Sequence, residues 1–179
     1  YPSPIAIPFT IYMAESSLRL GKTTAAQNLL DTVKMNDKAI SNHHKAAIDY
    51  LRGEVARQKG EFNKAIKIWE PVAKGIDRLY HTKASLALSL LKLAQKEISL
   101  EETINQVENL RFAWREDSLE VEILSTLGDL KAKNLQPLLA LEDFAKAIAI
   151  SKKINYDLAF LIESMQKIFY DLFINGAYP

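Results

Sequence analysis

The stretch Gly53–Val72, GEVARQKGEFNKAIKIWEPV, decides the fold of this chain, because Gly128–Ala147, GDLKAKNLQPLLALEDFAKA, repeats its spacing. In both stretches a glycine is followed after twelve residues by alanine, after four more by an aromatic residue, and after three more by alanine or valine. Small residues let two antiparallel helices approach closely, and a large ring fills the space beside them. The spacing therefore predicts helix pairs that repeat along the chain.

The first glycine supports this interpretation. Gly53 lies inside an expected helix, where glycine costs about 0.5–1 kcal/mol relative to alanine. We expect Gly53 to meet Ala65 where the two helices cross, and Trp69 to fill the gap to the next helix. The stretch that begins at Gly128 is expected to repeat this arrangement.

The composition suits a folded helical protein. Of the 179 residues, 48% are hydrophobic, which is enough for a continuous core. No cysteine is present, so a disulfide framework and thiol chemistry are excluded, while both a cytoplasmic and a periplasmic location remain open. No apolar stretch reaches the roughly 20 residues that cross a bilayer, so we expect no membrane insertion.

The net charge of +1 is unevenly distributed. Residues 1–95 hold 14 Lys/Arg and 8 Asp/Glu, which gives +6, and residues 96–179 hold 9 and 14, which gives −5. Such a chain could bind partners of opposite charge at its two ends or stack head to tail, unless the difference merely reflects solvated faces. No basic run with interleaved aromatic residues predicts nucleic-acid binding.

Local signals divide the chain into helices without any expected strand. Gly21 and Gly60 are each expected to end a helix, Ser99 with Glu102 to form a capping box, Pro137 to open a helix and Asn155 to cap the last one. We expect residues 1–7 to be a linker remnant and residues 8–179 a single helical-repeat domain. Its expected helix pairs span about 8–34, 38–74, 78–112 and 118–151, followed by a last helix over 155–174.

The repeated positions resemble the tetratricopeptide repeat. Leu127-Gly128 with Ala140, Phe144 and Ala147 matches that family's pattern well. Gly53, Ala65 and Trp69 match too, with departures at Arg52 and Val72; Ala14, Ala26, Leu30 and Val33 form a weaker copy, and Leu79–Phe112 a degenerate one. The resemblance implies an all-α, right-handed α-solenoid of about four antiparallel helix pairs plus a C-terminal capping helix.

A narrower resemblance concerns three short segments, Asp77–Tyr80, Leu110–Arg115 and Ile168–Phe173. They look like interior segments of large bacterial tetratricopeptide-type proteins of unassigned function. Together with a sequence that begins at Tyr1 rather than Met, this implies a piece of a longer protein. The resemblance supplies no activity.

Other motifs carry no chemistry. Leu20–Thr24, LGKTT, contains the tail of a phosphate-binding loop, but a serine replaces the glycine needed five residues earlier and a helix precedes it. His43 and His44 are adjacent, so on a helix they point about 100° apart and cannot share a metal. The acidic pairs at 101–102 and 116–117 suit helix starts. We predict no catalytic, cofactor-binding or metal-binding residues.

The segment Leu110–Arg115, LRFAWR, mixes aromatic residues with cations and allows two interpretations. It could be a binding patch in which arginine stacks on Trp114. Alternatively, Phe112 and Trp114 pack between the third and fourth repeats, and the arginines satisfy carbonyls at the end of a helix. The second interpretation is favoured.

Partner contacts in tetratricopeptide-like folds usually come from the first helix of each pair, which lines the concave face. When the positions that make these contacts are counted from Gly53 and Gly128, they give the candidate partner-binding residues of this chain. These are Tyr50, Glu54, Arg57, Glu122, Ser125, Asp129 and Lys133. The alternative is that they are ordinary solvated positions.

Two functions follow as expectations. The first is a non-catalytic scaffold that binds a peptide or protein partner through its concave face. The second is a structural spacer or self-association segment, whose partners are neighbouring repeats of the same chain or further copies. An all-helical enzyme is disfavoured, since no constellation of residues supports one.

Overall fold

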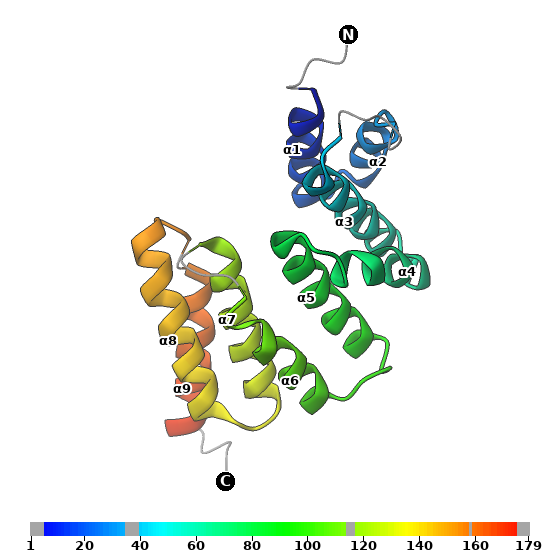
Figure 1. Cartoon of the computed structure of the whole chain (residues 1–179). Helices are drawn as coiled ribbons and strands as arrows, with labels where there is room; N and C mark the ends of the chain where they lie inside the picture. The colour runs from blue at the N-terminus through cyan, green and yellow to red at the C-terminus, as the bar shows by residue number, and fades with distance from the viewer. Residues whose placement is uncertain (1–5, 35–39, 114–116, 158, 175–179) are drawn as a thin grey trace. The chain divides into compact units, whose positions relative to one another are not determined.

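The computed structural model describes residues 6–34, 40–113, 117–157 and 159–174, and within them the backbone forms helices and no strand (Figure 1). The described helices are α1 (Ala6–Arg19), α2 (Thr23–Asp31), α3 (Asn42–Gln58), α4 (Phe62–Ala73), α5 (Arg78–Ala94), α6 (Leu100–Leu110), α7 (Ser118–Lys133), α8 (Pro137–Ile154) and α9 (Ala159–Phe173). The expected all-α fold is confirmed. Among these helices none combines the length and the apolar character needed to cross a bilayer.

The chain divides into two compact units, Tyr1–Leu91 (unit 1) and Lys92–Pro179 (unit 2). In unit 1, α1 packs on α2, α3 packs on α4, and α3 also contacts both α1 and α2. In unit 2, α7 packs on α6 and α8, and α9 packs chiefly on α8. Each unit therefore joins helices that are neighbours in sequence, as expected for a helical repeat.

Close helix packing in unit 1 depends on Gly53. A Cβ at this position would collide with the indole ring of Trp69, which is fully buried on α4. The indole Nε1 donates a hydrogen bond of 2.9 Å to the carbonyl oxygen of Tyr50, which satisfies the buried N–H. The ring itself, rather than Ala65, thus occupies the space beside the glycine, although Ala65 is fully buried as expected.

The same arrangement recurs in unit 2. A Cβ on Gly128 would lie 2.5 Å from the ring of Phe144, which is fully buried on α8. Ala140 and Ala147, one turn before and one turn after the ring, are also fully buried. The two stretches that share a spacing in the sequence therefore share a packing arrangement.

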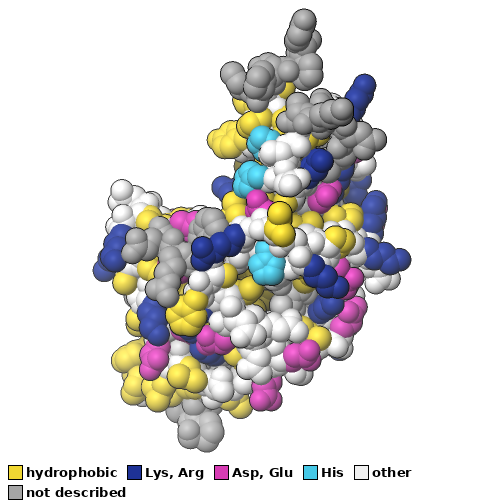
Figure 2. All heavy atoms as spheres, in the orientation of Figure 1, with side chains coloured by type: hydrophobic (Ala, Val, Ile, Leu, Met, Phe, Trp, Pro, Cys, Tyr) yellow, Lys and Arg dark blue, Asp and Glu magenta, His cyan; other side chains and the backbone are white. Residues whose placement is uncertain are grey.

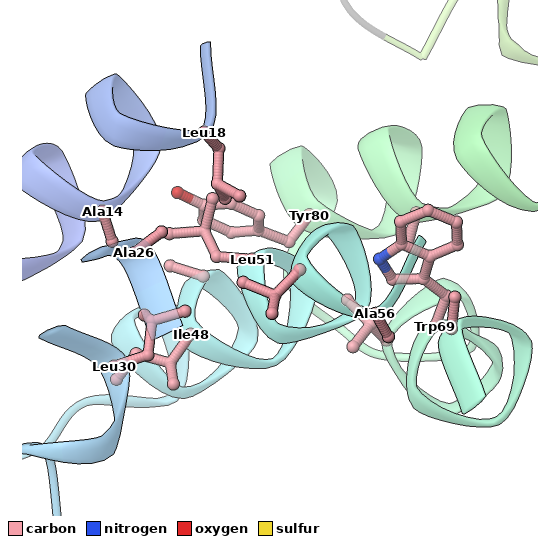
Figure 3. Packing of buried hydrophobic residues seen from close by; sticks show 14 of the residues in the cluster. Ala14, Leu18, Ala26, Leu30, Ile48, Leu51, Ala56, Trp69 and Tyr80 are labelled. Carbon is pink, nitrogen blue, oxygen red and sulfur yellow. The ribbon is translucent and has the colours of Figure 1, made fainter. Parts of the chain in front are cut away.

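A continuous apolar core runs through unit 1. It includes Ala14 of α1 and Ala26 and Leu30 of α2, so the weaker repeat copy is also confirmed as a packed pair. Figure 3 shows these side chains with Ile48, Leu51, Ala56, Trp69 and Tyr80 from the following helices. Tyr80, Ala84 and Leu88 of α5 belong to the same core, so side chains of α1, α3 and α5 pack together.

Most predicted helix ends are confirmed. Gly21 and Gly60 follow α1 and α3 with φ of +69° and +77°, a backbone conformation that glycine adopts without strain. The Ser99 hydroxyl accepts a hydrogen bond of 3.1 Å from the Glu102 N–H at the start of α6. Pro137 is the first residue of α8.

Asn155 has a different role from the predicted one. It does not begin α9; it ends α8 in the left-handed conformation, with φ of +53°. The carboxylate of Asp157 instead accepts a hydrogen bond of 2.9 Å from the Ala159 N–H at the start of α9. Asparagine tolerates the left-handed region better than most residues, which explains why it ends a helix here.

Two other helix starts differ from the predicted positions. α1 begins at Ala6, two residues before the expected start. α3 begins at Asn42 rather than near Lys38, and Ser41 accepts a hydrogen bond of 3.1 Å from the His44 N–H as its N-cap. Residues 1–5 and 35–39 lie outside the described residues.

Candidate functional site

Unit 1 gathers aromatic side chains where α3 meets α5. The rings of Tyr50 on α3 and Tyr80 on α5 lie 5.8 Å apart between centroids. The imidazole of His43, at the start of α3, lies 5.3 Å from the Tyr80 ring. Tyr50 also stacks on Trp69 at 6.2 Å, so the surface rings rest on the buried ring that fixes the helix pair.

Lys83 of α5 places a positive charge over these rings. Its Nζ atom lies 5.8 Å from the centroid of Tyr50 and 5.5 Å from that of Tyr80, within the range of cation–π attraction. The same atom lies 3.5 Å from the Glu15 carboxylate on α1. One lysine therefore connects α1, α3 and α5.

Asp77 joins the start of α5 to α3. Its Oδ2 atom lies 2.7 Å from Nδ1 of His43, and its Oδ1 atom accepts a hydrogen bond of 3.0 Å from the Tyr80 N–H. Burial by itself would raise the pKa of Asp77, but the hydrogen bonds from Tyr80 and His43 bring that pKa below its usual value. Asp77 thus caps the start of α5 and contacts the imidazole of His43 on α3 at once.

The phenol of Tyr80 is held in its neutral form. Burial, assisted by the nearby carboxylates of Glu15 and Asp77, raises the pKa of Tyr80 to about 12. The hydroxyl remains protonated at neutral pH and is able to donate a hydrogen bond. The group Glu15, His43, Tyr50, Asp77, Tyr80 and Lys83 is hereafter called the α1–α3–α5 surface.

The α1–α3–α5 surface is open to solvent at its charged members. The side chains of His43, Glu15 and Lys83 are 52%, 30% and 22% exposed. Carboxylates, cations and ring faces of α1, α3 and α5 thus lie side by side. Such a surface is able to contact polar and aromatic groups of another molecule, and in the described residues no group of three metal-ligating side chains accompanies it.

Three of the seven predicted partner-binding residues lie on α3, next to or within this surface. Tyr50 is a member of it. Glu54 is half-buried and accepts hydrogen bonds from Arg57, at 2.9 and 2.5 Å, and from Gln58, at 3.1 Å. The hydrogen bonds that Arg57 donates to Glu54 raise the pKa of Arg57, whose side chain stays 44% exposed. Arg57 therefore remains a charged, accessible group.

The other four predicted residues, Glu122, Ser125, Asp129 and Lys133, lie on α7 in unit 2. The Ser125 hydroxyl donates hydrogen bonds to its own helix, 2.8 Å to the Val121 carbonyl and 3.0 Å to that of Glu122. Burial raises the pKa of Asp129, and the charge of Lys133 partly opposes this shift. Glu122 and Lys133 are exposed. The seven residues therefore form two groups on two helices of separate units.

Sequence reasoning missed most of the α1–α3–α5 surface. Only Tyr50 was predicted, from its place one turn before Gly53. Its neighbours come from α1, from the start of α3, from the loop before α5 and from α5 itself, and no sequence spacing relates residues on these separate elements. A tyrosine and a lysine three residues apart on a first helix, Tyr80 and Lys83, are the one local signal that could have indicated it.

A second unpredicted cluster lies inside unit 2. The Lys131 ammonium on α7 lies 2.7 Å from Asp143 of α8 and 2.5 Å from Glu108 of α6. Arg111 contacts the same two carboxylates, each at 2.6 Å. Lys131 and Asp143 are both buried, so two cations and two carboxylates join three helices in the interior.

This cluster corrects the interpretation of Leu110–Arg115. Arg111 pairs with carboxylates of α6 and α8 instead of satisfying carbonyls at the end of its helix. Phe112 is 66% exposed rather than packed between repeats. The hydrogen bonds from Arg111 hold the pKa of Glu108 well down, at about 2, with help from Lys131. Trp114 and Arg115 lie outside the described residues.

Solved structures with the same arrangement of helices exist. One is the crystal structure of a Podosopora anserina protein described as a kinesin light chain with nearly identical TPR-like (tetratricopeptide-like) repeats. Its TM-score is 0.59 at 14% sequence identity, over 97% of this chain and 100% of that chain. A variant of that protein gives a TM-score of 0.61 at 15% identity, over 97% of this chain and 88% of that chain.

The likeness concerns three-dimensional structure rather than sequence. No family model matches the sequence, and no curated protein does. At 14–15% identity the likeness to the solved structures shows the fold alone. With helices that pair in sequence order around Gly53 and Gly128, the chain has an all-α, tetratricopeptide-like helical-repeat fold.

Proposed function

We propose that this chain is a non-catalytic binding module that holds a peptide or a protein surface against the first helices of its pairs. The observation that carries the proposal is the α1–α3–α5 surface. Its charged groups are partly exposed, although the repeat packing requires only apolar contacts between these helices. A scaffold role also agrees with the tetratricopeptide-like fold, which generally mediates contacts between proteins.

The chemistry of the surface favours a partner with both polar and aromatic groups. Lys83 and the exposed Arg57 offer positive charge, while Glu15, 3.5 Å from Lys83, and Asp77 offer carboxylates. The partly buried ring of Tyr50 adds a stacking contact, and the buried Tyr80 supports it from below. A mixed-charge peptide segment fits this combination better than a uniformly acidic or basic polymer.

Peptide selection with matched charge variants tests the proposal. Peptides selected from a displayed random library on the wild-type chain are measured by calorimetry against Arg57→Glu and, on α7, Asp129→Lys. The controls are Lys67→Glu on α4 and Glu142→Lys on α8, both exposed positions on second helices. We expect binding to weaken about tenfold or more in at least one first-helix variant and to be unchanged in both controls.

Two results would contradict this function. One is equal binding by all four variants at unchanged helicity, which would place the contacts elsewhere. The other is loss of binding in the second-helix controls alone, which would move the site to the opposite side of the pairs.

A further inference from the structure

Helix α9 carries an exposed apolar face. Leu161 and Ile168 are buried against the core of unit 2. On the side of α9 that faces away from this core, the side chains of Ile162, Phe169, Tyr170 and Phe173 are between 41% and 59% exposed. Figure 2 shows hydrophobic side chains gathered over the α8–α9 region, at the lower left. A single helix that exposes so many large apolar residues is typical of an interaction surface.

The face is also hollowed. A depression of about 520 Å³ is lined by Ile148 of α8 and by Ile162, Met165, Gln166, Phe169 and Tyr170 of α9. The rings of Phe169 and Phe173 contact each other at 4.5 Å between centroids and form one wall of apolar surface. In the described residues α3 packs on α4 and α7 packs on α8, each on the second helix of its pair. By contrast, within this part of the chain α9 packs on α8 and α7 and has no second helix of its own.

The residues around Gln166 form a self-complementary pattern. Ile162 and Tyr170 lie four residues to either side of Gln166, and a four-residue step returns to nearly the same helix face. If two α9 helices run antiparallel with Gln166 at the symmetry axis, Ile162 meets the partner's Tyr170. The two Gln166 amides then face each other, and each is both a donor and an acceptor.

The charges agree with the same arrangement. Glu163 and Lys167 are exposed on one flank of this face, and neither forms an ion pair within the described part of the chain. When two copies of one helix pair antiparallel across a two-fold axis, a given flank of the first helix lies beside the same flank of the second. The Glu163 carboxylate then comes within reach of the partner's Lys167, and the symmetry provides this ion pair twice.

We propose that α9 is a homodimerisation surface, on which the α9 helix of a second copy packs antiparallel across a two-fold axis near Gln166. The charge complementarity within α9 and the repeated use of helix-on-helix packing in this fold identify the occupant as another α9. An isologous two-fold contact is the commonest form of self-association in soluble proteins. This interface is independent of partner binding by the α1–α3–α5 surface.

Sedimentation over a range of concentrations tests the proposal. We expect the wild-type chain to dimerise with rising concentration and Phe169→Glu to remain monomeric at unchanged helicity. The matched control, Tyr12→Glu, alters a similarly exposed ring on α1 and is expected to dimerise like the wild type. A wild-type chain that stays monomeric at all concentrations would refute the proposal. Loss of the dimer in Tyr12→Glu would also refute it, because that result indicates a head-to-tail contact between α9 and α1.

Charge exchange tests the antiparallel geometry. Glu163→Lys and Lys167→Glu each place like charges together twice across the axis, so each is expected to weaken dimerisation about tenfold. The combined variant restores opposite charges and is expected to recover wild-type dimerisation. A combined variant as weak as the single ones would rule out this pairing.

Cross-linking locates the axis directly. Because the chain has no cysteine, Gln166→Cys introduces a single thiol, which we expect to form a disulfide-linked dimer under mild oxidation. Glu142→Cys, exposed on α8, is the control and is expected to stay monomeric. Equal cross-linking of both variants would show that collision, rather than a specific α9 contact, produces the dimer.

Discussion

At the scale of single residues, the fold depends on two glycines that leave room for two rings. Gly53 lies under Trp69 and Gly128 lies under Phe144, with no space for a Cβ in either place. Such contacts explain why glycine is retained inside helices that it would otherwise weaken. The helix pairs in which they lie are held together at these points.

Replacing the first of these glycines reverses the usual effect of a helix substitution. In an open helix Gly→Ala stabilises by about 0.5–1 kcal/mol. Gly53→Ala is instead expected to lower the free energy of unfolding by about 1–3 kcal/mol, because the added methyl group overpacks a buried indole. Denaturant unfolding measures the change.

A double variant shows whether the ring causes this loss. Trp69→Leu shortens the side chain above Gly53, so Gly53→Ala should be much less destabilising in that background than in the wild type. Strictly additive effects of the two changes would mean that the glycine and the indole do not touch.

For single residues, the sequence predicted the structure at positions where close packing restricts which residue type fits. The glycine, alanine and aromatic spacing identified the two helix pairs, although it placed Ala65 rather than Trp69 directly on Gly53. Asn155 was assigned to the wrong helix end, because asparagine serves at both ends and only backbone geometry distinguishes them. Residue type alone gives no such distinction.

At the scale of helices, unit 2 depends on a buried ionic cluster as well as on apolar packing. Lys131 and Asp143 are both buried, and Arg111 and Glu108 complete a neutral set of four charges. Removing one member of a buried pair leaves a charge without its partner, which is more destabilising than removing both.

This reasoning gives an ordered prediction for three variants. Asp143→Ala is expected to lower the free energy of unfolding by about 3–5 kcal/mol, because Lys131 and Arg111 then share only Glu108 and one positive charge in the cluster loses its counter-charge. Lys131→Met combined with Asp143→Leu should recover much of that loss. Thermal and denaturant unfolding measure both; a double variant less stable than Asp143→Ala would contradict the account.

The cluster also makes stability depend on acidity. The pKa of Glu108, about 2 in the folded chain, lies below the usual value of about 4.3 that the unfolded chain shows. Ionised Glu108 therefore stabilises the fold above about pH 4.3, and this contribution disappears as the pH falls towards 2. We expect Glu108→Gln to flatten that part of the unfolding profile, measured by denaturation at successive pH values.

The cluster shows what sequence cannot predict about helices. The apolar spacing predicted the helices of unit 2 well, because burial imposes a helical period. The partners of Lys131 come from α6 and α8, and no spacing rule relates charged residues on separate helices. For the same reason the α1–α3–α5 surface was predicted only at Tyr50.

At the scale of the whole molecule, each of the two units consists of helices that pack chiefly on their neighbours in sequence. In repeat proteins each pair contacts its neighbours, so stability is nearly a sum of local and nearest-neighbour contributions. The likeness to tetratricopeptide-like structures at 14–15% identity agrees with a fold defined by a few packing positions. Residues that face a partner are free of this restriction, which is why the fold was predictable and most of the site was not.

Local stability predicts where a core variant acts. Trp69→Ala removes a fully buried ring from unit 1 and is expected to increase amide hydrogen exchange chiefly in α3 and α4. Phe144→Ala should act in the same way on α7 and α8. Hydrogen exchange measured by mass spectrometry tests this local effect. If the chain instead unfolded cooperatively, either variant would increase exchange equally in all the described helices.

The central claim, that a ring lies directly on a glycine in both the α3–α4 and the α7–α8 pair, is tested most directly by nuclear Overhauser effects between the protons of the glycine and of the ring. We predict strong effects from the Gly53 Hα protons to the Trp69 indole and from the Gly128 Hα protons to the Phe144 ring, with upfield Hα shifts caused by the ring currents. Absence of these effects in the folded chain, at either glycine, would contradict the account.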